Sequence, residues 1–377
     1  MKEEIGATSW TLPHARERQR KPWLHIVLFG ITLVTTTMAG ALQNGVNPFS
    51  DPYQITSGLP FALTLMTILL VHEMGHYLMA RHHGVQATLP FFIPAPSFIG
   101  TFGAFIKLKS PPLDRRSLFD VGAAGPLAGL VLAIPAVIIG LHLSTVSIDN
   151  GMGGGITLGS SILLEFLSRL TLGLMPDEAN IIMHPIGFAG WIGLFITALN
   201  LIPVGQLDGG HVAYALFGQR HIWISRLSLV AILALGLIRY WDGWLIWSVL
   251  LLFMGVRHPP PLDPHTPLDL KRKLVGWFVV GVFVLTFIPA PFSIHQSKLP
   301  QEQIMPKPAK SPLETLEARA SQTERPTYSI LEDQVISNTG FESPCSTKGE
   351  SFRFSPLETP STLCPPQEAG FTLNKLI

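Results

Sequence analysis

The chain has 377 residues, of which 47% are hydrophobic and only 14% are charged. This balance, with a mean hydropathy of +0.37, excludes a typical soluble protein and indicates a core built in lipid. The net charge of +1 gives no sign of a basic face, so nucleic acid is not an expected partner. Two cysteines exclude a cysteine-based zinc module and a scaffold of several disulfides.

Seven apolar segments approach the length of about 20 residues that a membrane-spanning helix needs. They cover residues 23–43, 59–80, 118–142, 185–202, 222–239, 241–256 and 274–292. The sequence therefore predicts an all-α polytopic membrane protein with about seven transmembrane helices in a lipid bilayer. Lys and Arg flank these segments mainly on one side if the N-terminal segment 1–22 is cytoplasmic, so we expect a multi-pass protein of the cell (inner) membrane in that orientation.

The stretch between the second and third segments is apolar but does not have a helical pattern. Residues 89–93 and 97–110 are interrupted by Pro90, Pro94, Pro96, Gly100 and Gly103. This punctuation favours strands, so we expect a small membrane-associated β-hairpin. The alternative is a juxtamembrane loop with no binding role.

The composition changes abruptly after residue 292. Residues 293–377 are rich in Pro, Ser, Thr, Gln and Glu, which predicts a low-complexity, disordered tail without a catalytic role. Cys345 and Cys364 could form a disulfide if this tail lies outside the cytoplasm, and would stay reduced if it lies inside.

The second apolar segment ends in a motif that can bind metal, His72-Glu73-Met74-Gly75-His76. Two imidazoles four residues apart lie on one helix face, so His72 and His76 can both reach one zinc ion. Glu73 is rotated toward the side where a zinc-bound water would sit, which is the HExxH arrangement of metalloproteases. Ionisable residues inside a span are retained mainly where they pair, bind metal or line a wet cavity. The alternative is a helix end whose polar groups simply meet water.

A zinc site of this kind needs a third protein ligand, and Asp208 is the strongest candidate. It follows the fourth segment on the predicted cytoplasmic side, after Pro203 and Gly205, which should break the helix there. Asn200 is placed to hydrogen-bond the backbone carbonyls that such a break frees. Asp208 could instead be an ordinary turn residue, because Asp-Gly is a common turn signal.

Several nearby residues have a simpler interpretation. His82, His83 and His211 fall outside the ligand spacing and are interpreted as interfacial residues or neighbours of the site. Small residues at helical spacing typically serve helix packing, which we expect of Gly122, Gly125 and Gly129.

The two motifs together resemble the site-2 protease family of intramembrane zinc metalloproteases. The resemblance covers about residues 59–218, and the stretches 100–105 and 120–129 are most similar to the subgroup that includes the plant chloroplast ethylene-dependent gravitropism-deficient and yellow-green proteases. It implies a catalytic core of three helices, one zinc ion held by His72, His76 and Asp208, and Glu73 as the general base. It also implies that the segment before the third span presents an edge to substrate, with Gly100, Gly103 and Asn200 as candidate substrate-binding or neighbouring residues.

The predicted function is that of an intramembrane zinc endopeptidase whose transmembrane metalloprotease domain covers residues 23–292. Its substrates would be transmembrane proteins, cleaved near the cytoplasmic face. The loop 143–184 is far too short for a PDZ domain, which needs about 80–100 residues, so gating by such a domain is not expected. Two alternatives remain, an inactive relative acting as a membrane scaffold or chaperone and a metal transporter.

Overall fold

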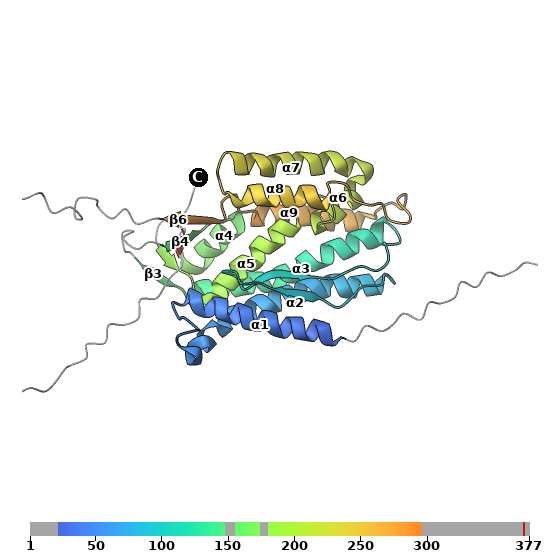
Figure 1. The fold of residues 1–377 in the computed structure, drawn as a ribbon. Coiled ribbons are helices and arrows are strands. Elements are labelled where there is room, and N and C mark those ends of the chain that lie inside the picture. The colour runs from blue at the N-terminus through green and yellow to red at the C-terminus, as the bar shows by residue number, and fades with distance from the viewer. Residues whose placement is uncertain (1–21, 148–154, 174–179, 296–371, 374–377) are drawn as a thin grey trace, which may run out of the picture. The chain divides into compact units, whose positions relative to one another are not determined.

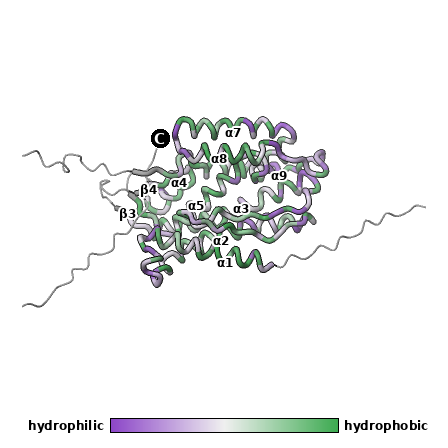
Figure 2. Tube along the Cα trace, in the orientation of Figure 1, coloured by the Kyte–Doolittle hydropathy of each residue, from purple (hydrophilic) through white to green (hydrophobic). Residues whose placement is uncertain are grey.

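The structure is a computed structural model that describes residues 22–147, 155–173, 180–295 and 372–373. All of these belong to one of the two units into which the chain divides. The described part is mostly helical, with long helices running side by side (Figure 1). These helices are mainly apolar, and the hydrophilic residues gather where the chain turns at their ends (Figure 2).

The first three long helices are α1 (Trp23–Gln43), α2 (Leu59–His82, after the 3-10 helix η1, Pro52–Gly58) and α3 (Arg115–His142). Helix α3 begins at a capping box, because the Asp114 carboxylate accepts the backbone N–H of Ser117 at 2.7 Å and the Ser117 hydroxyl accepts the backbone N–H of Asp114 at 3.0 Å. It therefore starts three residues before the predicted apolar segment. Two prolines, Pro126 and Pro135, lie inside it.

Two short strands lie between α2 and α3. Strand β1 (Phe91–Pro94) pairs antiparallel with β2 (Thr101–Phe105), with an irregular register near the turn. Helix α1 binds this turn through its side chains, since Thr35 Oγ1 donates to the Gly100 carbonyl at 2.7 Å and Gln43 Nε2 donates to the Phe98 carbonyl at 2.8 Å. The strands are shorter than the predicted stretches 89–93 and 97–110 because the turn takes up residues 95–100.

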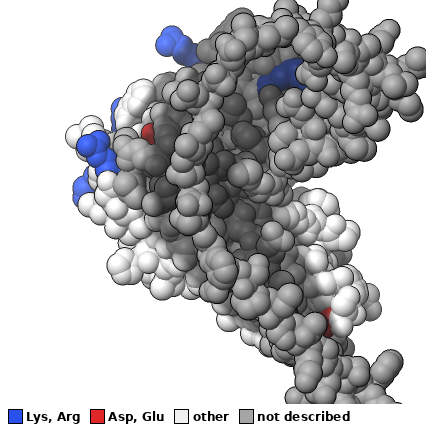
Figure 3. All heavy atoms as spheres, turned by 90° about the vertical axis from the view of Figure 1, so that its left-hand side faces the viewer, with Lys and Arg blue, Asp and Glu red and all other residues white. Residues whose placement is uncertain are grey.

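A small layer of strands and one helix follows α3. It contains β3 (Thr145–Ser147), β4 (Gly155–Leu158), α4 (Ile162–Leu172) and β5 (Asn180–Ile182). These strands join β6 (Phe292–His295) and β7 (Thr372–Leu373) in a five-stranded sheet of order β3-β5-β7-β4-β6. Figure 3 views the protein from this end and shows charged side chains of the described residues only at scattered places.

The second half of the described chain contains five helices. They are α5 (Pro185–Asn200), α6 (Asp208–Phe217), α7 (His221–Leu237, after the 3-10 turn η2, Gly218–Arg220), α8 (Gly243–Met254) and α9 (Leu270–Thr286). The bidentate bond of Arg272 to Asp120 joins the beginnings of α9 and α3, while β6 and β3 join their far ends to one sheet. Helices α3 and α9 therefore run in the same direction.

Among the described residues, four helices are long and apolar enough to cross a membrane. They are Trp23–Gln43, Pro52–His82, Arg115–His142 and Asp208–Leu237. Helices α5 and α8 are apolar but short: the 16 residues of α5 span about 24 Å, against about 30 Å of hydrocarbon. The structure thus supports a helical membrane protein but not the predicted count of seven spans, because α5, α8 and α9 have only 16, 12 and 17 residues.

The core is formed where α2, α3 and α5 pack together. Fully buried aromatic side chains such as Phe61, Phe188 and Trp191 fill it. Gly140 of α3 faces Gly187 of α5 so closely that neither position has room for a side chain. Such close packing of small residues holds helices together where lipid removes the hydrophobic drive for association.

Much of the predicted disordered tail lies outside the described residues, as do Cys345, Cys364 and residues 1–21. Residues 293–295 and 372–373 of that tail are strands of the five-stranded sheet.

Candidate metal centre

The HExxH motif lies in the second half of α2, inside a long apolar helix. His72, Glu73 and His76 are each no more than 6% exposed. Helical spacing puts both imidazoles on the face of α2 that packs against α3. Burying three ionisable groups in this setting is unfavourable unless they bind one another or a ligand.

Asp208 reaches the imidazoles because the chain breaks between α5 and α6. The break runs from Leu201 to Leu207, and Gly205 adopts a positive φ of 55° within it. Asp208 is the first residue of α6, and Gly209 and Gly210 bring that helix start against the carbonyls of Leu201 and Gly205. The glycine pair thus allows the start of α6 to approach the broken loop closely.

The three side chains have the spacing of a metal site. Asp208 Oδ2 lies 3.3 Å from His72 Nε2 and 3.3 Å from His76 Nε2. Tetrahedral zinc with bonds of about 2.0–2.1 Å separates its ligand atoms by about 3.3 Å. One ligand atom from each residue lies within 4.8 Å of the other two, so the group could hold one metal ion. Two imidazoles and one carboxylate also match the three-ligand sets that leave a fourth position open.

Neighbouring groups hold the imidazoles in place. His76 Nδ1 lies 2.7 Å from the Val121 carbonyl, and because a carbonyl only accepts, Nδ1 carries a hydrogen. The Nε2 lone pair of that tautomer is then available to a metal ion shared with Asp208. Asn200 Nδ2 lies 3.3 Å from His72 Nε2. Asn200 thus lies beside the metal-binding group, with its amide directed at an imidazole.

Three glycines of α3 each make room for one histidine. A side chain at Gly129 would meet His72, one at Gly125 would meet His76, and one at Gly122 would meet His211. We had expected these glycines to serve helix packing. The structure gives them a second effect, since they let three imidazoles lie directly against the α3 backbone.

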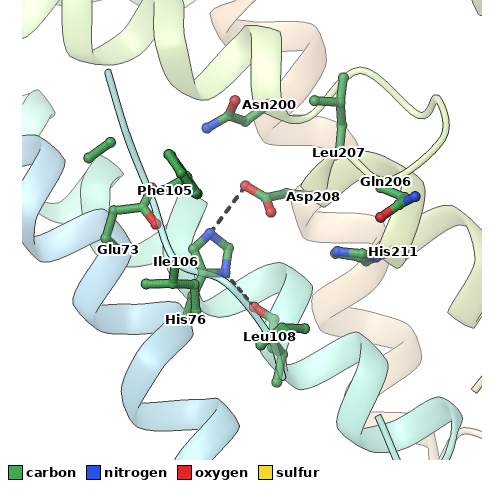
Figure 4. Close-up of a pocket in the computed structure, with 12 residues that line it drawn as sticks. Glu73, His76, Phe105, Ile106, Leu108, Asn200, Gln206, Leu207, Asp208 and His211 are labelled. Carbon is green, nitrogen blue, oxygen red and sulfur yellow. Dashed lines mark hydrogen bonds and ion pairs between the residues drawn. The ribbon is translucent and has the colours of Figure 1, made fainter. Parts of the chain in front are cut away.

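A cavity of about 200 Å³ opens beside this group (Figure 4). Its lining includes Glu73, His76, Asn200, Asp208, His211, and residues 104–106 and 108 at the end of β2. The Glu73 carboxylate and the Asp208 carboxylate both point into it from different helices (Figure 4). Gly100 and Gly103 do not line this cavity: Gly100 packs against the backbone of α1, and a side chain at Gly103 would meet nothing.

The sequence did not connect His211 with two further histidines. His211 Nδ1 lies 2.5 Å from Nε2 of His258, which belongs to the loop after α8 and also contacts His221. Nothing in the spacing of these histidines suggests a cluster, because His258 follows His211 by 47 residues across two helices.

Comparison with known proteins agrees with this geometry. The family model "Peptidase family M50" matches residues 60–237, which contain both motifs. The chain is 32% identical over 283 residues to "Probable zinc metalloprotease EGY2, chloroplastic" of Arabidopsis thaliana, with 72% of this chain and 50% of that protein covered. It is 38% identical over 247 residues to "Probable zinc metalloprotease EGY1, chloroplastic" of Oryza sativa subsp. japonica, with 62% and 41% covered.

The chain spans about half the length of the curated relatives it matches. These relatives are named as zinc metalloproteases, and the two-histidine, one-carboxylate group fits zinc, so zinc is the cofactor that both observations imply. The resemblance drawn from the two motifs is confirmed: residues 60–237 form a domain of peptidase family M50, the site-2 protease family of membrane zinc metalloproteases.

Proposed function

We propose that this protein is an intramembrane zinc endopeptidase that cleaves transmembrane segments of other proteins near the cytoplasmic face. The observation that carries the proposal is the meeting of His72, His76 and Asp208 near Glu73, at one side of the cavity. We propose that His72, His76 and Asp208 hold one zinc ion. When bound, zinc supplies Lewis-acid polarisation of a water molecule and of the scissile carbonyl.

Glu73 has the position required of the general base. Its carboxylate lines the cavity together with Asp208 but is not part of the three-residue metal group. It would accept a proton from the attacking water as the new C–O bond forms, and return that proton to the amide nitrogen as the C–N bond breaks. Asn200 would hold the substrate chain or steady His72, next to which its amide lies.

The β2 strand would present the substrate to this site. Within the part of the chain that the structure describes, β1 and β2 form a two-stranded sheet, so one edge of β2 has no strand partner there, and the end of β2 lines the cavity. An unwound transmembrane segment must satisfy its backbone hydrogen bonds, and pairing with a strand edge does so. We therefore propose that the β1–β2 hairpin is membrane-associated and binds substrate in extended form.

The experiment is cleavage of a purified single-span test protein in detergent by the wild type and by Glu73→Gln. We expect wild-type cleavage that a zinc chelator stops, and no cleavage by Glu73→Gln although it retains about one zinc per chain. Equal cleavage by both proteins would refute the proposal. Absence of wild-type cleavage of any membrane substrate would favour a scaffold. Zinc flux into vesicles that Glu73→Gln does not change would favour a transporter.

A further inference from the structure

A second group of histidines lies directly behind one wall of the cavity. His211 comes from α6, His221 from the first turn of α7 and His258 from the loop after α8, and the Tyr214 ring packs against the last two with centroid distances of 4.9 and 5.1 Å. His221 and His258 are no more than 7% exposed. Neither belongs to the proposed zinc group or lines the cavity, whereas His211 does line it.

The contacts of His221 determine its tautomer. Its Nδ1 lies 2.8 Å from the Gly218 carbonyl, which can only accept, so Nδ1 carries the hydrogen. Its Nε2 is then an acceptor, and it receives the backbone N–H of His258 at 3.3 Å. His221 thus fixes the backbone of the loop after α8 at the residue whose ring contacts His211.

His258 in turn engages one ring nitrogen of His211. The contact joins His258 Nε2 to His211 Nδ1 at 2.5 Å, with the two ring planes 82° apart. Burial, together with the neighbouring His211 and His221, lowers the pKa of His258 to about 3, so this ring is neutral at physiological pH. A neutral ring forms an N–H···N hydrogen bond here rather than a repulsive pair of cations.

This contact leaves the second ring nitrogen of His211 available to the cavity. The Cβ of His211 lies close to the α3 backbone, because a side chain at Gly122 would stand 2.5 Å from it. In Figure 4 the His211 ring extends toward Asp208 along the same wall. We propose that His211 hydrogen-bonds the bound substrate chain through Nε2, and that His258 is the positioning residue that orients it.

The inference rests on the proposed function. Substitutions by asparagine and glutamine can separate its two parts, the bond between His211 and His258 and the contact of His211 with substrate. The amide of Asn reaches about as far as Nδ1 of histidine and that of Gln about as far as Nε2. His211→Asn should therefore keep the bond to His258 and lose the substrate contact. His258→Gln should keep the bond to His211, whereas His258→Asn should lose it. The exposed His82 of α2 supplies the matched control, His82→Asn.

Cleavage of the single-span test protein is the first measurement, with zinc content measured in parallel. Loss of one hydrogen bond predicts that His211→Asn and His258→Asn lower kcat/KM about three- to tenfold at unchanged zinc content. We expect His258→Gln and His82→Asn to stay near the wild type. The double change His211→Asn with His258→Asn should be no worse than His211→Asn alone.

A measurement of peptide binding tests the role of His211 without relying on cleavage. A fluorescent peptide from the same span is titrated into Glu73→Gln protein with and without His211→Asn, and we expect weaker binding by about three- to tenfold. Unchanged kcat/KM and unchanged peptide affinity in His211→Asn would overturn the inference, even if Glu73→Gln still abolishes cleavage. A cluster with only a structural role would lower zinc content and thermal stability in His258→Gln as much as in His258→Asn, which would also overturn it. If the wild type cleaves nothing, the proposed function fails and the peptide affinities alone decide the inference.

Discussion

The imidazole of His76 occupies the space in which a side chain at Gly125 would stand. The ring cannot simply move aside, because its Nδ1 is bound to the Val121 carbonyl at 2.7 Å and its Nε2 lies 3.3 Å from Asp208 Oδ2. The position of His76 in the metal group therefore depends on how closely α3 packs against α2. A single methyl group added to α3 at residue 125 would disturb both the packing and the metal group.

Gly125→Ala should accordingly impair metal binding. The added methyl pushes the His76 ring out of line with Asp208, so we expect zinc content to fall well below one per chain. Cleavage should fall at least about tenfold, since only a correctly placed ligand set supports the chemistry. Gly281→Ala on α9, where an added side chain would meet nothing, is the control. Elemental analysis of purified protein checks this, and full zinc occupancy in Gly125→Ala would contradict it.

The capping box of α3 predicts a loss of stability at Asp114. Asp114→Ala removes the N-cap acceptor and should destabilise the protein by about 1 kcal/mol, which lowers the melting temperature by about 2–4 °C. Asp114→Asn, which keeps an acceptor, should lose much less. Thermal unfolding in detergent measures the difference, and equal losses in both variants would show that the cap is not responsible.

The loss of stability in Asp114→Ala should depend on pH, because the Asp114 carboxylate is titratable. Burial raises the pKa of Asp114, but its hydrogen bonds with Ser117 outweigh burial, and the net pKa lies below the ordinary value. Because the pKa of Asp114 is lower in the folded protein, its ionised carboxylate stabilises the fold fully above the ordinary pKa of about 4. This stabilisation is lost as the pH falls through the folded-state pKa. The melting temperatures of wild type and Asp114→Ala should therefore converge in acid. A gap that is constant down to about pH 2 would contradict this reasoning.

A third prediction concerns the attachment of α9. Arg272 binds both carboxylate oxygens of Asp120, at 2.8 and 2.6 Å, and His83 Nε2 lies 2.8 Å from the same carboxylate. Because the pair is partly exposed, Arg272→Gln should cost about 1 kcal/mol and lower the melting temperature by about 2–4 °C. The adjacent exposed Lys271→Gln should have no comparable effect. Equal melting temperatures for the two variants would argue against a role for the Asp120 contact.

A fourth prediction addresses the proposed substrate edge. Proline at Ala104 removes a backbone N–H from the end of β2 that lines the cavity, so Ala104→Pro should lower cleavage at least about tenfold while zinc content stays the same. Ala104→Ser, which keeps the N–H, is the matched control. Wild-type cleavage by Ala104→Pro would remove β2 from the proposed mechanism.

The approach of His72, His76 and Asp208 to one another could be predicted because its signals in the sequence are local. Helical spacing alone puts His72 and His76 on one face, and Pro203 with Gly205 indicates the break that brings Asp208 to them. The chain also carries the signals of α4, since the Ser161 side chain accepts the Leu164 backbone N–H and Gly173 ends the helix at a φ of 69°. The loop 143–184, although too short for a PDZ domain, thus carries the local signals of a helix.

The features that the sequence did not predict depend on distant contacts. The meeting of His211 with His258, and of Gly125 with His76, requires the packing of separate helices and loops. The structure supports four of the seven predicted spans by length, because apolarity alone does not distinguish a full crossing from short apolar helices such as α5 and α8. Strand β6 begins after α9 and a short connection, residues 287–291, and pairs with β4, which composition alone does not indicate.

The most direct test of the central claim is to map protein termini in membranes of cells that contain either the wild type or Glu73→Gln. Mass spectrometry should find new termini inside the apolar segments of membrane proteins, toward their cytoplasmic ends, only with the wild type. Uncleaved membrane stubs should accumulate with Glu73→Gln. Identical termini in both membranes, or wild-type-dependent cuts confined to soluble domains, would contradict the account.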